Sequence, residues 1–576
     1  ILGLFGQTRI HSLYAAAAAT GIAAVPLLLA ARRVPAPPPV SAPRGYALCA
    51  ASLLLLPLIW LPPFFYDTLR YHYGLPSMFL RSGFTRPLPW FVESHFPLAV
   101  EMLSLTGMAD ASHIGANLAN FVFLAICCLG ILCLADRLGC RRAGLIGMPL
   151  FLYSSTSIHT LFLQKNDLGV ALFFFAFVYA LLLYRESGGD RRFLFLAAAL
   201  CGIALGTKYT MLVFTGIMFL LGFGRPLQGE GRRPPARILQ DAFLFLLVAA
   251  VVYSPWPLRN VVSAGNPVYP LLSGIFPSPT WSPEQMRLLA GDAHSLTSRF
   301  QTWKDPLRLL LSLTFFPDTD LSGLGASIGA GFIGAVLFTF FRRKPAAGWT
   351  FLANAFLAYF LAWFLTSWFS RFLLPALPLM ALLTGSLISI WMERAGKWGR
   401  VLAAVLVAGL VGAQVASAVA PAEYTQIHNA WRTSFRLMGR PERAALLASR
   451  FSSSYQAAQF VNTGLPETAR VLFVGETLPY PYRRDIVVPS AYDKHPLQEV
   501  ALPGRKPDEI RRILAAQGFT HLLVHWPEWE RLGEQYYRLR WEKEDRMAVD
   551  RFLTALPVVH RDRAISIHSL GEDANR

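Results

Sequence analysis

Charged residues are scarce in this 576-residue chain. Asp, Glu, Lys and Arg make up 15% of it, hydrophobic residues make up 54%, and the mean hydropathy is +0.40. A soluble domain usually carries about 25% charged residues. The scarcity excludes a soluble protein of this size and predicts a membrane protein with several spans.

Cysteine is rare as well. The six cysteines are Cys49, Cys127, Cys128, Cys133, Cys140 and Cys201. All of them fall in apolar spans or beside basic loops, so an external disulfide framework is excluded. Their spacing does not match a zinc site, and the pair Cys127-Cys128 is interpreted as helix packing.

Two further patterns are missing. The segment Val474-Gly475-Glu476 lacks the additional glycines that a dinucleotide-binding turn needs. We also see no internal repeat, which counts against the repeated architecture of many transporters.

Long apolar segments occupy the first 420 residues. A membrane-spanning helix needs about 20 apolar residues, and about twelve segments approach this length. They lie at 12–31, 46–64, 113–135, 143–163, 168–184, 193–206, 209–224, 241–254, 322–341, 347–368, 373–391 and 401–420. The short segments 193–206 and 209–224 could instead be one helix kinked at Gly206-Thr207-Lys208. That alternative would invert the membrane orientation of every segment after residue 224.

Basic residues gather in alternate loops between these segments. The groups are Arg32/Arg33/Arg44, Arg137/Arg141/Arg142, Arg185/Arg191/Arg192, Arg232/Arg233/Arg237, Arg342/Arg343/Lys344 and Arg394/Lys397/Arg400. This is the positive-inside pattern, and it accounts for the net charge of +18 without nucleic acid. Two helices in 193–224 keep every basic loop on one side, so we favour two helices.

The resulting topology places the less basic loops outside the cytoplasm. These outer segments are 65–112, 164–167, 207–208, 255–321, 369–372 and the tail from 421. Residues 1–11 would also be outside. Because the sequence starts with Ile1 there, we expect a missing N-terminal piece with another span or a cleaved signal.

The composition changes at about residue 421. Val471–Val474 and His521–His525 read as buried strands, and Pro507–Gln517 has helical spacing with Ile510 and Leu514 on one face. Strand, helix and strand together predict a small α/β domain over 421–576, outside the cytoplasm. The fold class is therefore mainly α: a polytopic helical membrane domain, 1–420, followed by this domain.

Asp67 directly follows the apolar stretch Leu48–Phe65, in the run Phe64-Phe65-Tyr66-Asp67-Thr68-Leu69-Arg70-Tyr71-His72-Tyr73. An ionised Asp beside a span is costly unless it is paired or used. The aromatic residues around it would desolvate and position the carboxylate, which favours a functional role. The alternative is an interfacial residue paired with Arg70 or Arg81.

Five more charged residues fall on the same outer face. They are Lys165, Asp167, Lys208, Arg259 and Arg371. Three of them have a structural alternative: Asp167 could cap a helix, Lys208 could snorkel, and Arg259 could be an interfacial anchor. Cations that converge on a site with a carboxylate base indicate an anionic leaving group.

Several motifs together resemble the GT-C glycosyltransferases. They are the Tyr66-Asp67 loop, Lys165-Asn166-Asp167, Leu205-Gly206-Thr207-Lys208, Pro255-Trp256-Pro257-Leu258-Arg259-Asn260 with Gly265-Asn266-Pro267-Val268-Tyr269-Pro270, and Arg371-Phe372-Leu373-Leu374-Pro375-Ala376-Leu377-Pro378. More narrowly, the chain resembles the bacterial phospholipid-carrier-dependent branch, related to protein O-mannosyltransferases and lipid A aminoarabinose transferases. The resemblance covers about 46–392. It implies a seven-span module over about 46–254 with large outer loops at 65–112 and 255–321.

The resemblance also implies an activity. The expected reaction is transfer of a hexose or pentose from a polyprenyl-phosphate or diphosphate donor to a glycan, lipid or protein hydroxyl, with inversion. Asp67 would be the general base, and Lys208, Arg259 and Arg371 would hold the phosphate. The other residues expected around the substrate are Tyr66, Arg70, Tyr71, His72, Glu93, His95, Lys165, Asp167, Asn260 and Tyr269. The expected location is the bacterial inner membrane, with the active site outside the cytoplasm.

One departure from the family pattern concerns metal binding. Many members have two adjacent acidic residues in the first loop, whereas Thr68 follows Asp67 here. A divalent ion held by Glu93, His95 and Asp167 is therefore a hypothesis. A transporter or flippase of lipid-linked sugars, and a membrane scaffold that presents the C-terminal domain, are the alternatives to an enzyme.

Overall fold

The computed structural model describes residues 52–571 with gaps. The gaps are 89, 110–111, 225–232, 278–280, 283–284, 288, 290–301, 303, 315–327, 330, 342–345, 367–368, 420–429, 439–452, 536–540 and 542. The predicted span 12–31 lies outside the described residues.

Apolar helices make up most of the described membrane part. They are α5 (Ile114–Arg137), α6 (Arg141–Leu152), α7 (Ser155–Leu163), α8 (Asp167–Glu186), α9 (Arg191–Leu205), α10 (Met211–Phe223), α11 (Pro235–Tyr253), α16 (Gly331–Phe341), α17 (Ala347–Thr366), α18 (Leu377–Arg394) and α19 (Lys397–Val419). Among the described residues, six helical segments are long and apolar enough to cross a membrane. The chain is thus a multi-pass integral membrane protein.

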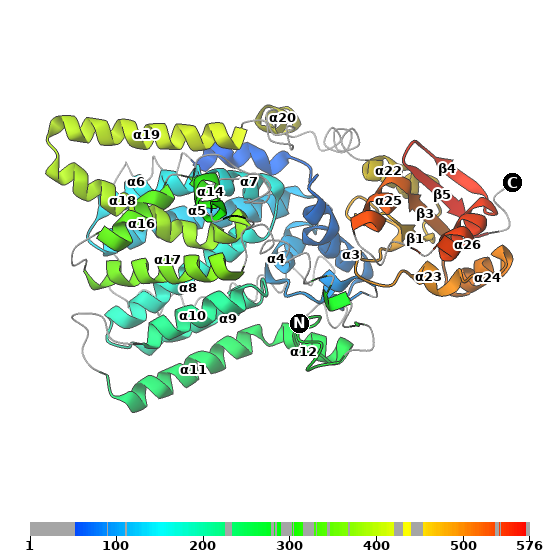
Figure 1. The fold of residues 1–576 in the computed structure, drawn as a ribbon, viewed down its shortest axis with the longest axis horizontal. Coiled ribbons are helices and arrows are strands. Elements are labelled where there is room, and N and C mark those ends of the chain that lie inside the picture. The colour runs from blue at the N-terminus through cyan, green and yellow to red at the C-terminus, as the bar shows by residue number, and fades with distance from the viewer. Residues whose placement is uncertain are drawn as a thin grey trace.

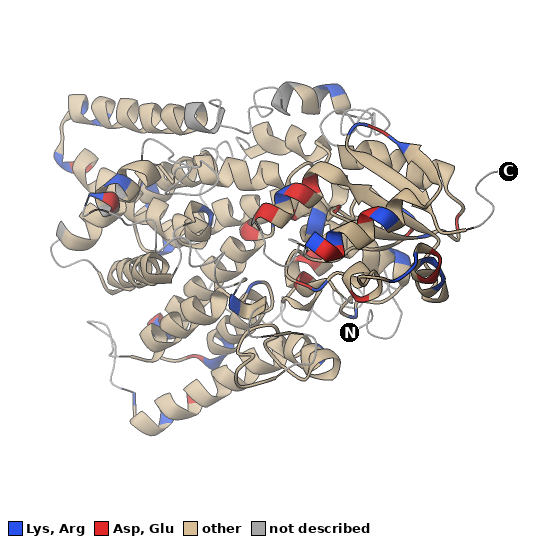
Figure 2. Cartoon of the chain, turned by 45° about the vertical axis from the view of Figure 1, so that its right-hand side comes forward, with Lys and Arg blue, Asp and Glu red and all other residues tan. Residues whose placement is uncertain are grey.

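The two-helix interpretation of 193–224 is confirmed. Helix α9 ends at Leu205 and α10 begins at Met211, with Lys208 in the connection between them. Helices α18 and α19 are connected at the end of the bundle away from the C-terminal domain (Figure 1). Charges are sparse along the helices themselves (Figure 2).

Two predicted spans have a different form. The described part of 46–64 is a 3-10 helix, η2 (Leu53–Trp60), rather than an α-helix. Pro57 lies inside it, and a proline lacks the backbone donor that an α-helix needs. Segment 143–163 is divided into α6 and α7 at Tyr153-Ser154, where the Ser154 side chain accepts from Ser157 N and caps α7. About twelve spans therefore remains a prediction.

Helix α18 lies at the centre of the bundle, and α19 lies at its periphery. In the span that includes α18, 89% of the apolar window is buried, against 11% for α19. A Cβ on Gly147 of α6 would lie 2.5 Å from Ala381 O of α18. The glycine thus permits the close backbone approach that small residues give membrane helices.

Short helices fill the outer loops. The first loop contains η3 (Thr68–His72), α3 (Gly74–Ser82), η4 (Val92–His95) and α4 (Ala99–Gly107). The others are α12 (Pro255–Ala264), α14 (Asp305–Thr314) and η6 (Ser370–Ala376). These loops therefore hold their polar side chains on ordered backbone.

The C-terminal region is a small α/β domain. Its sheet has the order β2-β1-β3-β5-β4, and β1 is parallel to β2 and β3, whereas β5 is antiparallel to β3 and β4. The strands are β1 (Arg470–Val474), β2 (Asp485–Val487), β3 (His521–His525), β4 (Val558–Arg561) and β5 (Ile565–Ser569). Its helices are α22 (Ser453–Gly464), α23 (Pro496–Val500), α24 (Pro507–Ala516), α25 (Trp526–Gln535) and α26 (Lys543–Thr554), whereas α20 (Ala430–Leu437) contacts η2 of the membrane part. Both predicted strands and the predicted helix between them are confirmed.

Candidate functional site

The carboxylate of Asp67 receives two cations from distant parts of the chain. Its Oδ2 atom accepts from Lys165 Nζ at 2.9 Å and from Arg371 Nη1 at 3.1 Å. Asp67 precedes η3, Lys165 lies between α7 and α8, and Arg371 lies in η6. Three loops that the sequence placed on one face therefore meet at one carboxylate.

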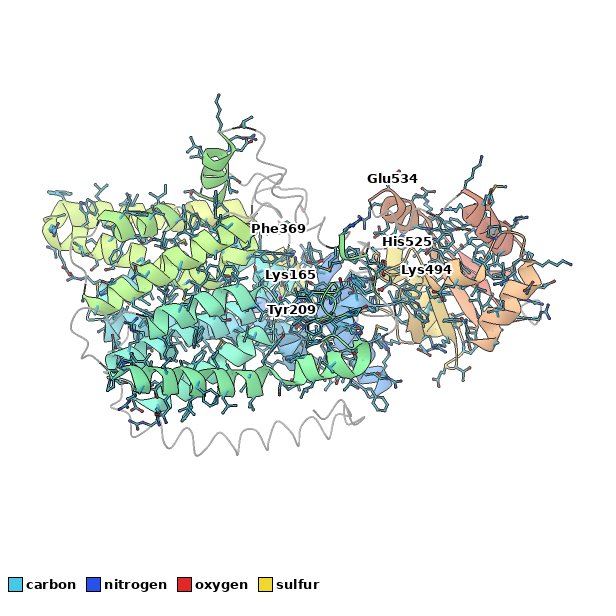
Figure 3. The ribbon with its side chains drawn as sticks, turned by 60° about the horizontal axis from the view of Figure 1, so that its bottom comes forward. Lys165, Tyr209, Phe369, Lys494, His525 and Glu534 are labelled. Carbon is cyan, nitrogen blue, oxygen red and sulfur yellow. The ribbon has the colours of Figure 1, made fainter. Side chains whose placement is uncertain are left out.

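A second ion pair continues this network. Lys208 Nζ lies 2.7 Å from Oδ1 of Asp167, the first residue of α8. The same ammonium lies 4.3 Å from the centre of the Phe372 ring, next to Arg371 in sequence. In Figure 3, Lys165, Tyr209 and Phe369 lie where the helical bundle meets the outer loops. We call Asp67, Lys165, Asp167, Lys208 and Arg371 the charged cluster.

The charged cluster is largely buried, and three of its side chains are partly exposed. The side chains of Lys165 and Asp167 are 1% and 4% exposed, whereas those of Asp67, Arg371 and Lys208 are 20–24% exposed. Three cations face two carboxylates, which leaves one positive charge uncompensated when all five are ionised. A partly desolvated site with excess positive charge attracts an anion.

Burial and charge act in opposite directions on Asp67. Burial favours the neutral acid, but the adjacent cations of Lys165 and Arg371 outweigh it and hold the pKa of Asp67 well below its usual range. Burial, together with repulsion from Arg371, lowers the pKa of Lys165 to about 7 despite the neighbouring carboxylates. Asp67 is therefore a carboxylate at neutral pH, and Lys165 titrates there.

The carboxylate of Glu101, which the sequence did not single out, holds the residues that follow Asp67. Glu101 Oε1, on α4, lies 2.7 Å from His72 Nδ1 and accepts from Asn166 Nδ2 at 2.9 Å. The Tyr71 ring packs on His72, with 4.1 Å between ring centroids. Glu101 thereby ties η3 to the segment that presents Lys165 and Asp167.

Arg70 and Glu93 form a pair beside the charged cluster. Arg70 donates to Glu93 through Nε at 2.6 Å and Nη2 at 3.0 Å, and its Nη1 donates to Thr477 O at 2.9 Å. Tyr66 OH lies 2.8 Å from Thr477 Oγ1. These predicted pocket residues thus contact the C-terminal domain, and Thr477 carried no sequence signal.

Arg259 belongs to a third group instead of the charged cluster. Its Nη2 donates to Phe96 O at 3.0 Å, and it makes no ion pair within the described residues. Asn260 Nδ2 donates to His95 O at 2.9 Å, and Tyr209 OH donates to Tyr269 O at 2.9 Å. The expected grouping of Arg259 with Lys208 and Arg371 is therefore not seen as direct contact. Tyr209, next to Lys208, links the two groups.

The predicted metal ligands do not come together. Glu93 pairs with Arg70, Asp167 pairs with Lys208, and His95 packs on Tyr269 with ring centroids 4.4 Å apart. Burial and the charge of Arg259 lower the pKa of His95 to about 3. Over the described part of the chain, no three His, Cys, Asp or Glu residues form a group that could hold a metal ion. Glu93, His95 and Asp167 thus do not fit the proposed ion.

The fold is similar to that of ArnT from Cupriavidus metallidurans. Its structure bound to undecaprenyl phosphate aligns with a TM-score of 0.54 over 92% of this chain and 99% of that chain, at 13% identity. Its apo structure aligns with a TM-score of 0.50 over 91% and 98%, at 14% identity. The resemblance to GT-C proteins is thus confirmed at the level of the fold.

A sequence family covers part of the same region. The profile of a domain of unknown function, DUF8201, matches residues 104–377. The match includes Lys165, Asp167, Lys208 and Arg371 but begins after Asp67. No curated protein matches the chain in sequence.

Proposed function

We propose that this protein is a membrane glycosyltransferase that moves a sugar from a polyprenyl-phosphate donor to an acceptor hydroxyl. The charged cluster carries this proposal, because it brings two carboxylates and three cations together at the outer end of a GT-C-like helical bundle. The similar ArnT structure is bound to undecaprenyl phosphate, which supports a lipid phosphate as the donor's carrier.

The cluster supplies the two groups that such a transfer needs. The acceptor oxygen attacks the anomeric carbon while the bond from that carbon to the phosphate oxygen breaks, so the configuration inverts. Asp67 takes the acceptor proton, a form of help typically worth about 10²–10⁴-fold in rate. Lys208 and Arg371, both partly exposed, stabilise the charge that develops on the departing phosphate.

The ion pairs of Asp67 fit this division of roles. A carboxylate held by Lys165 and Arg371 is ionised but weakly basic, because both cations stabilise its charged form. A phosphate bound by Lys208 and Arg371 competes with Asp67 for Arg371. Donor binding therefore weakens the pairing of Arg371 with Asp67 and raises the basicity of Asp67 when the acceptor is present.

The proposal includes the layout of the chain. The transmembrane part comprises about 1–420, with the seven-span module at about 46–254, and 421–576 is the outer domain. The active site and this domain lie outside the cytoplasm of a bacterial inner membrane. Lys397 and Arg400 at the start of α19 belong to the opposite, basic end, which supports this orientation. The sugar is a hexose or pentose, and the acceptor is a glycan, a lipid or a protein.

A transfer assay with purified protein tests the proposal. Wild-type protein in detergent or nanodiscs receives a radiolabelled sugar on polyprenyl phosphate, with candidate acceptors, and the anomeric configuration of the product is determined by NMR. We expect transfer with inversion, and Asp67→Asn should reduce it by about 10²-fold or more. Asp136→Asn, near the opposite end of α5, is the matched control and should transfer at the wild-type rate.

The result also separates this activity from its alternatives. A flippase would move the donor across a bilayer without cleaving it, and a scaffold would do neither. Absence of product from every donor and acceptor pair, or full activity of Asp67→Asn, would reject the proposed roles.

A further inference from the structure

The C-terminal domain holds the backbone on both sides of Asp67. Before Asp67 in the sequence, Pro63 O accepts from Tyr455 OH at 2.7 Å. After Asp67 in the sequence, Leu69 O accepts from Tyr480 N at 3.2 Å. Figure 1 shows this domain beside α3, the helix that follows. A soluble domain appended after the last span thus contacts the loop that carries the proposed base.

Side chains beside Asp67 converge on one residue of that domain. The Thr477 hydroxyl forms a 2.8 Å hydrogen bond with the Tyr66 hydroxyl. The Thr477 carbonyl accepts from Arg70 Nη1 at 2.9 Å. Tyr66 precedes Asp67, and Arg70 lies three residues after it. Thr477 is 3% exposed and Arg70 is 3% exposed, so these contacts are shielded from water.

The turn that presents Thr477 is itself fixed. Glu476 Oε1 accepts from Thr477 N at 2.8 Å and from Leu478 N at 2.9 Å. Gly475 adopts φ +78°, and a Cβ there would lie 2.6 Å from His525 O at the end of β3. Thr477 is therefore presented on a rigid turn rather than on a flexible segment.

This turn lies at the edge where α/β domains usually bind ligands. Strands β1 and β3 are parallel, so their carboxyl ends, Val474 and His525, meet at one edge of the sheet. Ligands of open α/β sheets bind outside that edge. In this protein, Tyr66 and Arg70 occupy the place beside it.

Arg70 is fully engaged in these contacts. Each of its three guanidinium nitrogens donates, two of them to Glu93 and one to Thr477 O. Binding of a substrate anion by Arg70 would break the pair with Glu93, which is 7% exposed. Arg70, which the sequence predicts in the substrate pocket, thus links the first loop to the C-terminal domain through Thr477.

We infer that Thr477 is a positioning residue for Asp67, so that the C-terminal domain completes the active site. This inference rests on the proposed glycosyltransferase function. Asp67 must lie within hydrogen-bond reach of the acceptor hydroxyl, and small displacements of a catalytic group lower the rate strongly. The Thr477 contacts fix the residues on both sides of Asp67 without touching the substrate.

Three variants test the role of the Thr477 hydroxyl. Thr477→Val removes the hydroxyl but keeps the shape and the carbonyl that receives Arg70, whereas Thr477→Ser restores the hydroxyl. Thr463→Val is the matched control, because the Thr463 hydroxyl bonds only within α22, to Gln459 O, among the described contacts. For each protein, kcat, the KM for the donor and amide hydrogen exchange of residues 64–80 are measured.

A positioning role predicts a specific pattern. Thr477→Val should lower kcat about 5-fold, as expected for one lost hydrogen bond, with an unchanged donor KM and faster exchange of the 64–80 amides. Thr477→Ser and Thr463→Val should match wild type. Tyr66→Phe removes the same bond from the other side, so the double variant with Thr477→Val should be no slower than either single variant.

Other outcomes overturn the inference. Unchanged kcat and exchange in both Thr477→Val and Tyr66→Phe would show that the contact positions nothing, as would equal losses in Thr477→Val and Thr477→Ser. Hydrogen exchange needs no activity, so it tests the contact even if no transfer is found. Absence of transfer by wild type would reject the proposed function, whereas normal exchange in Thr477→Val would reject the positioning role.

Discussion

The two ends of the helical bundle carry charges in different ways. At the basic end, ion pairs such as Arg137–Glu186 and Arg142–Glu393 have side chains 28–58% exposed. At the outer end, Lys165 and Asp167 are nearly fully buried within a network drawn from four separate segments. Exposed pairs contribute little stability, and buried charges are costly. Exposed basic groups of this kind orient membrane proteins, and we propose that the outer end retains its buried charges for a function.

One buried carboxylate at the basic end sharpens this comparison. Asp241 on α11 is fully buried, and it accepts from Arg191 Nε at 2.8 Å and from Tyr184 OH at 2.9 Å. Its partners lie on neighbouring helices and satisfy both carboxylate oxygens. Asp241 therefore serves as a structural counterpart to Asp67, whose described partners all reach Oδ2.

The largest effect is expected for loss of a phosphate-binding cation. Lys208→Met should lower kcat/KM for transfer by about 10²–10³-fold, because the departing phosphate loses a charged donor in a partly dry site. Steady-state kinetics with a labelled donor measures it. Lys397→Met, an exposed lysine at the basic end, is the control and should stay within about twofold of wild type. Equal losses of kcat/KM in both variants would show that the cations at the two ends do not differ in function.

A pH dependence is expected at the outer end. The pKa of Lys165 is lowered to about 7, so Lys165 is charged below pH 7 and neutral above it, while Asp67 stays ionised because its pKa is held far lower. Loss of the Lys165 charge removes the excess positive charge of the charged cluster, so the donor KM should rise several-fold as pH increases from about 6 to about 8. Lys165→Arg keeps its charge over this range and should flatten the profile. A KM that is equally pH-dependent in Lys165→Arg would contradict the assignment to Lys165.

A smaller effect, on stability alone, is expected for Asp241. Asp241→Asn should lower the free energy of unfolding by about 1–3 kcal/mol, because Arg191 loses a charged partner and a buried group loses hydrogen bonds. Thermal unfolding in detergent measures this change. The folded variant should keep its wild-type kcat, so a large loss of kcat without a loss of stability would count against a purely structural role.

The smallest effect is expected for an exposed pair. Arg142 Nη1 lies 3.5 Å from Glu393 Oε1, and both side chains are more than half exposed. Arg142→Ala should change the free energy of unfolding by less than about 0.5 kcal/mol. A loss of unfolding free energy as large as that of Asp241→Asn would show that exposure does not distinguish weak ion pairs from stabilising ones.

The sequence predicted those features that depend on local composition. Apolar length located α5, α8, α9, α10 and α11 closely, and charge in the loops placed Lys165, Lys208 and Arg371 with Asp67. Short continuous apolar runs predicted β1 and β3. Each of these signals is carried by neighbouring residues.

Contacts between distant residues were beyond the reach of such signals. Thr477 meets Tyr66 across 411 residues, and nothing in its neighbourhood marks it. Glu101 resembles any loop carboxylate until His72 and Asn166 are seen beside it. The three-residue strand β2 and the four-residue strand β4 were missed because they are too short for a periodic signal. Strand β5 was missed because Ser566, His568 and Ser569 interrupt its apolar residues. Arg259 shared a face with the charged cluster, but sidedness does not determine contact.

The central claim is that Asp67 acts in the chemical step rather than in binding the donor. It is tested most directly by single-turnover transfer with Asp67→Asn, after donor binding to the same sample has been measured. The variant should bind the labelled donor within a few-fold of wild type and form product at least about 10²-fold more slowly. Product formation at the wild-type rate, with the donor bound, would contradict it.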